Sequence, residues 1–85
     1  MHCSTAAQIN WVANTFFLGQ PGLVLLWVEG DRLRSPLWYD EVEGVPVDPR
    51  FPHVYGPLNL DAVVRVELLQ PASDGQFAIA LPAAS

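Results

Sequence analysis

The chain has 85 residues, and its 51% hydrophobic and 15% charged residues are typical of a single globular domain rather than a disordered chain. It has no lysine, and nine carboxylates outnumber four scattered arginines. The formal net charge of −5 argues against nucleic acid as a partner. The longest apolar run, 23–28, is too short to span a bilayer, the N-terminus lacks a signal-peptide pattern, and the single cysteine excludes an intrachain disulfide. We therefore expect a cytoplasmic protein without a membrane partner.

An amphipathic helix is predicted at the N-terminus. Thr5 and Gln8 have the spacing of a capping box, in which a hydroxyl and an amide each satisfy a free backbone N–H. Apolar residues then recur at i, i+3, i+4 and i+7, at Ile9, Val12, Ala13 and Phe16. The helix should end near Leu18, because Gly19 and a Pro-Gly pair follow.

Most of the remaining chain is predicted to form strands. The continuous apolar run 23–28 favours a central strand covered on both faces. Further strands are expected at 37–42, 51–56 and 63–69, and a turn at Asp74-Gly75 should return the chain as a partner strand over 76–81. Short helical turns are expected at 31–34 and 59–62, and residues 82–85 should form a tail.

The segment 51–58 carries the clearest functional signal. Its two prolines hold the residues before them, Phe51 and Gly56, in extended geometry. Side chains alternate along a strand, so His53 and Tyr55 should share one face and Val54 should lie on the other. An imidazole and a phenol on one rigid face could line a small-molecule pocket. The alternative is that both are packing residues whose polar tips bind the backbone.

The N-terminal residues give further candidates with simpler alternatives. His2 and Ser4 share a face if this segment is extended, although His2 could equally be a solvated terminal residue. Ser4 and Thr5 could donate to a phosphate at the start of the helix or serve only as caps. Cys3 is expected to pack, since burial raises the pKa of a thiol. A metal site from His2, Cys3 and His53 lacks further ligands at metal-like spacing, so none is predicted.

Acidic residues gather just before the 51–56 strand. Most such charges are solvated, although one of them could orient His53 or contact a ribose hydroxyl. They are Asp40, Glu41, Glu43 and Asp48. The sequence contains no glycine-rich phosphate loop, no GxSxG elbow and no HExxH motif, which excludes the commonest nucleotide, hydrolase and zinc-protease signatures.

The chain resembles a known family along nearly its whole length. The likeness is carried by HCSTAAQ at 2–8, the helix ending in Phe-Phe, the 23–28 strand followed by DxL, the segment FPHVYGPLNLDAVVRV at 51–66 and a closing DGxF at 74–77. These segments are similar to the bacterial domain-of-unknown-function family 952. The resemblance implies a fold like that of ADP-ribosyltransferases, a split β-sheet whose cleft holds NAD in true transferases.

The resemblance also implies roles for the matching residues. His2 or His53 would hold ribose or phosphate, Ser4 and Thr5 would donate to phosphate, and Tyr55, followed by Gly56, would stack on the nicotinamide. No glutamate matches the catalytic acid, so enzymatic activity stays open.

Family members usually begin with a strand bearing a Tyr-His pair and a helix, and this chain begins after them. We therefore expect an exposed sheet edge that invites self-association, and a version extended upstream should be more stable.

The sequence thus predicts one α+β domain over 1–85, with the helix packed on a mostly antiparallel, split sheet of four or five strands. The first function expected is binding of NAD or a related nucleotide, with transfer unproven. The alternative is a non-catalytic binding or interaction module that has lost the chemistry.

Overall fold

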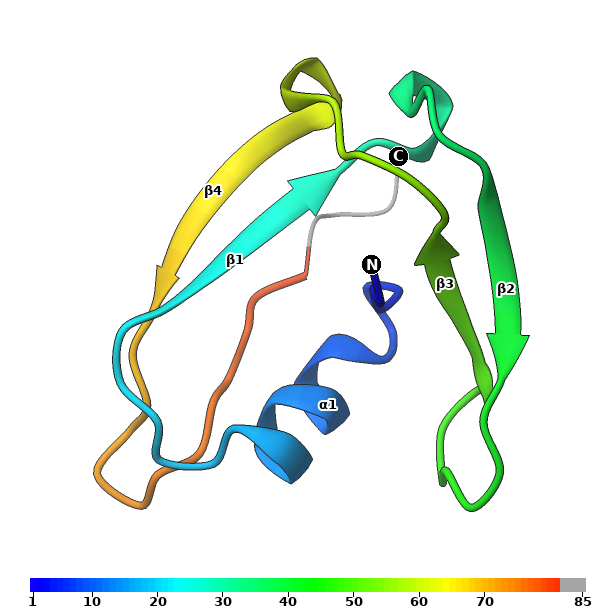
Figure 1. Ribbon diagram of the computed structural model, residues 1–85. Coiled ribbons are helices and arrows are strands. Elements are labelled where there is room, and N and C mark those ends of the chain that lie inside the picture. Colours follow the sequence, from blue (N-terminus) through cyan, green and yellow to red (C-terminus); the bar gives the residue numbers. More distant parts are fainter. Residues whose placement is uncertain (82–85) are drawn as a thin grey trace.

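A short helix is followed by two separate pairs of antiparallel strands in the computed structural model, which describes residues 1–81 (Figure 1). The elements are α1 (Ile9–Phe16), β1 (Leu23–Val28), β2 (Leu37–Glu41), β3 (Arg50–Val54) and β4 (Val63–Leu69). Single 3-10 turns, Gly30–Arg32 and Leu60–Ala62, follow β1 and precede β4. The α+β class is confirmed, but the strands form two two-stranded sheets rather than one sheet of four or five. The tail expected at 82–85 lies outside the described residues.

The strand pairing joins one pair of segments that are distant in sequence and one pair that is adjacent. β1 pairs with β4, and β2 pairs with β3. The prediction that 76–81 would pair with β4 is wrong, because this segment is not a strand. Two asparagine side chains of α1 form hydrogen bonds with the backbone of the segment 76–81 instead. Asn14 exchanges two hydrogen bonds with the backbone of Phe77, at 2.7 and 3.0 Å, and Asn10 does the same with Ile79, at 2.7 and 3.1 Å.

Gln8 attaches the start of α1 to the hairpin that joins β2 to β3. Its side chain is fully buried, and Oε1 accepts the Thr5 N–H at 2.8 Å, which is the amide half of the expected capping box. The hydroxyl half is not formed within residues 1–81, since the Gln8 N–H donates to the Thr5 carbonyl at 3.0 Å instead. Nε2 donates to the carbonyls of Asp48 and Arg50, at 2.7 and 2.8 Å. A single amide therefore satisfies backbone groups from both segments.

The hydrophobic core lies between α1, β1 and the segment after β4. Ala13, Phe77 and Ile79 are buried there. The face of β1 that packs on this cluster carries Leu23, Leu25 and Trp27. The opposite face of β1 is exposed, which corrects the expectation that β1 is covered on both faces. The last residue of the predicted helix face, Phe16, is also exposed and contacts Trp11 edge to face.

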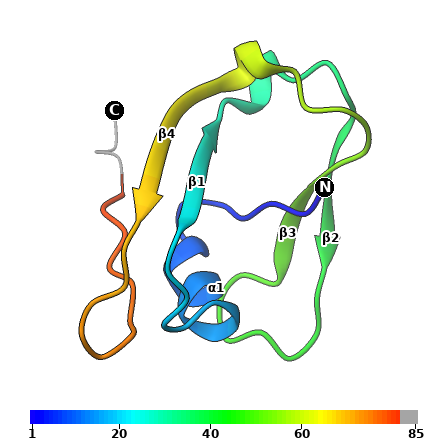
Figure 2. The same cartoon turned by 60° about the vertical axis from the view of Figure 1, so that its left-hand side comes forward.

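The two connections between the sheets run side by side (Figures 1 and 2). Asn59 accepts the Arg34 N–H at 3.0 Å and donates to the Arg32 carbonyl at 2.9 Å. The Arg34 guanidinium pairs with Asp61 at 2.6 Å. These contacts join the two sheets at one end of the space between them. α1 lies at the other end of that space. Within residues 1–81, no helix is long and apolar enough to cross a membrane.

Candidate functional site

The β2·β3 sheet has two chemically different faces, because side chains alternate along each strand. The inner face looks toward β1 and carries apolar side chains for the most part. It consists of Leu37, Tyr39, Pro52 and Val54, all of which line a cavity between the two sheets. The outer face carries Trp38, Asp40, Phe51 and His53, which the pairing register places side by side.

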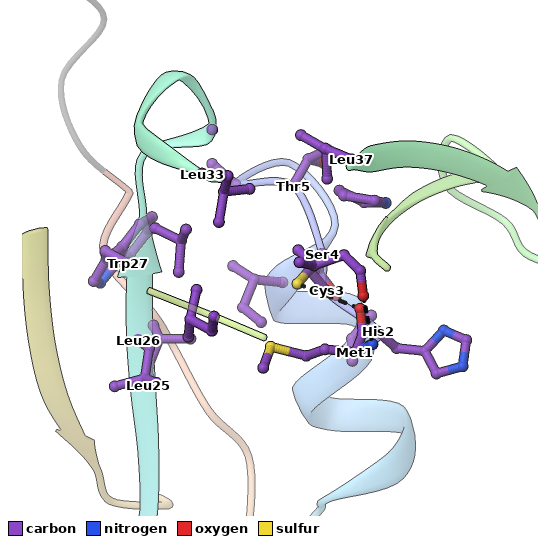
Figure 3. Close-up of a pocket in the computed structure, with 18 of the residues that line it drawn as sticks. Met1, His2, Cys3, Ser4, Thr5, Leu25, Leu26, Trp27, Leu33 and Leu37 are labelled. Atoms are coloured by element: carbon purple, nitrogen blue, oxygen red, sulfur yellow. Dashed lines mark hydrogen bonds between the residues drawn. The ribbon is translucent and has the colours of Figure 1, made fainter. Parts of the chain in front are cut away.

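Residues 1–3 extend this sheet along the free edge of β3. The Cys3 N–H donates to the Pro52 carbonyl and the Val54 N–H donates to the Met1 carbonyl, both at 2.9 Å. His2 therefore lies opposite His53 as an isolated antiparallel bridge. Figure 3 shows its ring pointing away from the cavity. The ring of His2 therefore joins the outer face, although residues 1–3 all contribute to the lining of the cavity.

Three rings of the outer face are in contact. His53 and Tyr55 are stacked, with ring centroids 4.1 Å apart and planes 12° from parallel. The ring of His2 meets His53 edge to face at 4.2 Å. The structure therefore brings together three of the residues singled out by sequence, and the expectation that His53 and Tyr55 share a face is confirmed.

Asp40 holds this stack in place. Its Oδ2 accepts a hydrogen bond of 2.6 Å from the Tyr55 hydroxyl and lies 3.3 Å from His53 Nδ1. The acidic cluster was expected to include a carboxylate that could orient His53, and Asp40 occupies that place. His53 Nδ1 is buried and has no geometrically satisfactory hydrogen bond among residues 1–81. Its ring is held by stacking on Tyr55 and by the amino terminus, whose nitrogen lies 3.3 Å from His53 Nε2.

The surroundings of His53 and Tyr55 favour the neutral form of both rings. Loss of solvation, the positive amino terminus and His2 lower the pKa of His53, and the Asp40 carboxylate opposes them. The hydrogen bond to Asp40 raises the pKa of Tyr55, so the phenol stays protonated and acts as a donor. At neutral pH the site therefore offers a neutral imidazole, a phenol and one carboxylate.

An open hollow of about 360 Å³ lies beside the stack. It is lined by Trp38, Tyr39, Asp40 and Tyr55. The indole of Trp38 is 64% exposed and can accept another flat ring. Sequence reasoning did not single out Trp38. The alternation of β2 opposite the His-Tyr strand is the signal that would have placed both Trp38 and Asp40 on the same face.

The other predicted site residues lie elsewhere. Ser4, Thr5 and Cys3 line the cavity between the sheets, where burial raises the pKa of the Cys3 thiol. Gly56 follows Tyr55 with φ at +145°, and a Cβ there would lie 2.6 Å from the Ser35 hydroxyl, so a glycine is required for packing. No group of three metal-ligating side chains occurs within the described part of the chain.

Comparison with family models decides the relationship of this chain to known proteins. Residues 1–66 match the model of a protein of unknown function, DUF952. The chain belongs to this family. Comparison with curated proteins gives no match.

Solved structures give the family fold. The X-ray structure of protein CC0527 from Caulobacter crescentus is 36% identical, with a TM-score of 0.78, and that of its double mutant is 35% identical with the same score. Each match covers 92% of this chain but 66% of the Caulobacter chain. This DUF952 chain therefore spans somewhat less than two thirds of the relative's length.

Proposed function

We propose that this chain binds NAD or a closely related nucleotide on the outer face of β2·β3, within a fold related to that of ADP-ribosyltransferases. The observation that carries the proposal is the stacked pair of His53 and Tyr55, anchored by Asp40 next to the hollow beside Trp38. The resemblance to the family supports the choice of nucleotide.

The chemistry of the hollow suits a nucleoside. A base or nicotinamide ring can stack on the exposed indole of Trp38, and a cationic nicotinamide gains attraction from the aromatic face. Oδ2 of Asp40 accepts the hydrogen bond of the Tyr55 hydroxyl and faces His53, whereas its Oδ1 makes no hydrogen bond within residues 1–81. That oxygen can accept a hydrogen bond from a ribose hydroxyl.

The phosphate contacts differ from those that the resemblance implies. Ser4 and Thr5 line the cavity between the sheets, whereas His53 does not. One compact site cannot use both sets, so the proposal assigns the phosphate to the exposed ring of His2. A phosphate contact here is weak, since the chain has a formal net charge of −5.

Titration of NAD and ADP-ribose, followed by tryptophan fluorescence, tests this proposal. We expect a saturable change that Trp38→Leu abolishes and Trp11→Leu, on α1, retains. Tyr55→Phe removes the bond to Asp40 but keeps the ring, and should weaken binding by roughly three- to tenfold, the value of one hydrogen bond. Absence of a saturable change up to millimolar concentrations of both ligands would overturn the nucleotide proposal.

A non-catalytic interaction module is the second candidate. The half-exposed apolar side chains Val24 and Leu26 on β1, opposite Leu68 and Val66 on β4, favour it, because monomeric proteins seldom leave such faces bare. Self-association through a sheet edge would be one form of this function. No glutamate is matched to a catalytic acid, so transfer of ADP-ribose is not part of the proposal. The cytoplasmic location stays a prediction.

A further inference from the structure

The hollow beside the stack combines aromatic and acidic surface, and no basic residue lines it. Of its four lining residues, Trp38, Tyr39 and Tyr55 are aromatic and Asp40 is acidic. The aromatic surface is accessible, since Trp38 is 64% exposed and Tyr55, which stacks on His53 with one face, is still 48% exposed. The faces of such rings carry negative charge density and attract a cation that lies over them. The hollow therefore presents two kinds of negative surface to one ligand.

The carboxylate of Asp40 has no cationic partner of its own. The three other ion pairs among residues 1–81 each join an arginine to a carboxylate outside the hollow, at 2.6 to 3.1 Å. Asp40 instead faces His53, whose Nδ1 lies 3.3 Å from Oδ2. Because the surroundings of His53 lower its pKa, this imidazole is neutral at neutral pH and supplies no counter-charge. The Tyr55 hydroxyl donates a hydrogen bond to Asp40 but no charge.

We propose that the hollow selects organic cations whose charge is spread over carbon-bound hydrogens, such as a pyridinium ring or a quaternary ammonium group. Aromatic faces recognise cations of this kind, and a carboxylate beside the rings adds attraction without requiring an N–H donor from the ligand. A divalent metal ion fits less well, because it needs several oxygen ligands and the hollow offers one carboxylate.

The inference rests on the same hollow as the nucleotide proposal, and it adds a charge requirement to that proposal. The nicotinamide ring is a cation in the oxidised cofactor and neutral in the reduced one, so the oxidised form should bind better. The phosphates of a nucleotide are repelled by a chain with a formal net charge of −5, whereas a cationic fragment without phosphates is attracted. The cationic group alone should therefore bind.

Two matched pairs of small ligands test the charge requirement on the unaltered protein. The first pair is N-methylnicotinamide, a pyridinium cation, and neutral nicotinamide. The second is choline and its neutral analogue in which carbon replaces the charged nitrogen. Titration into the millimolar range, followed by the NMR signals of the Trp38 indole and the Tyr55 amide, should show each cation binding roughly three- to tenfold more tightly than its neutral partner. Tighter binding of the pyridinium would indicate an oxidised nicotinamide as the source of the cation, and tighter binding of choline a quaternary ammonium compound.

A pair of variants tests whether Asp40 supplies the charge. Asp40→Asn removes the charge but keeps a side-chain oxygen that can accept the hydrogen bond of Tyr55. It should reduce the preference for the cation over its neutral partner by about two- to fivefold. Glu43→Gln removes the same charge from an exposed position outside the hollow and should leave the preference unchanged.

Two results would overturn the inference: equal binding of the charged and neutral members of both pairs, or no binding of either cation. Its failure is distinguishable from failure of the nucleotide proposal. If the cations bind and NAD does not, only the nucleotide proposal fails. If NAD and its reduced form bind equally well and the matched pairs show no preference, only the charge requirement fails.

Discussion

The two faces of the β2·β3 sheet differ in how completely their side chains are partnered. On the outer face, Tyr55 and His53 stack and share one carboxylate, and His2 packs against them. On the inner face, Leu37 and Val54 border the cavity of about 640 Å³ between the sheets. The same two five-residue strands, whose side chains alternate, therefore carry a polar cluster on one face and line an apolar cavity with the other.

This contrast separates a cluster that ring stacking and a hydrogen bond hold together from a cavity that apolar side chains line. The polar cluster is assembled within the described residues, so it can be tested with small ligands on the protein by itself. Variants that alter one face of the sheet without altering the other test this contrast.

The largest effect is expected for Gln8→Ala, which cuts the attachment of α1 to the β2–β3 hairpin. The change leaves the Thr5 N–H and the carbonyls of Asp48 and Arg50 without their partner in a buried place. We expect the free energy of unfolding to fall by about 3 kcal/mol. Chemical denaturation measures it, with Gln20→Ala, at an exposed position, as the unaffected control. Equal stability of the two variants would show that the attachment contributes little.

The next effect concerns the junction that follows Tyr55. Gly56→Ala brings a Cβ to 2.6 Å from the Ser35 hydroxyl at a φ of +145°, and should cost about 1–3 kcal/mol. Gly44→Ala is the matched control, since Gly44 has a φ of +77° with open space around it and should cost about 1 kcal/mol or less. Thermal unfolding compares the two. A cost at Gly56 no greater than at Gly44 would contradict the close approach to Ser35.

The smallest effect is a pH dependence that belongs to the outer face. The folded-state pKa of His53 lies below its unfolded value of about 6.5, so below that pH the unfolded chain binds more protons and folding becomes less favourable. The groups that face the imidazole are His2, Asp40, Tyr55 and the amino terminus. Unfolding midpoints should fall as the pH drops below about 6.5. His53→Gln should flatten this part of the profile, and an unchanged slope would rule out His53 as its source.

The sequence predicted the parts of the fold that local patterns determine. The apolar run of β1 gave its exact bounds, and the proline-bounded segment placed His53 and Tyr55 together. It failed for the segment 76–81, because Asn10 and Asn14 of α1 take the backbone groups of Ile79 and Phe77 that a strand would have used. Side-chain amides acting on a distant backbone leave no periodic signal.

Only part of the candidate site could be predicted, because sequence patterns do not show which residues of different strands come into contact. Alternation groups residues within one strand, so His53 and Tyr55 were found. Their neighbours Trp38 and Asp40 come from β2, and only the pairing register brings them into contact. The resemblance placed Ser4 and Thr5 with the histidines, but the backbone pairing with β3 reaches only as far as Cys3, and both residues line the cavity instead.

Amide chemical-shift mapping of the labelled protein with NAD tests the division between the two faces most directly. We expect shifts at Trp38, Asp40, His53 and Tyr55, with Leu26 and Leu33 across the cavity unaffected. Shifts centred on the cavity residues, or no shifts at millimolar NAD, would contradict the assignment of nucleotide binding to the outer face.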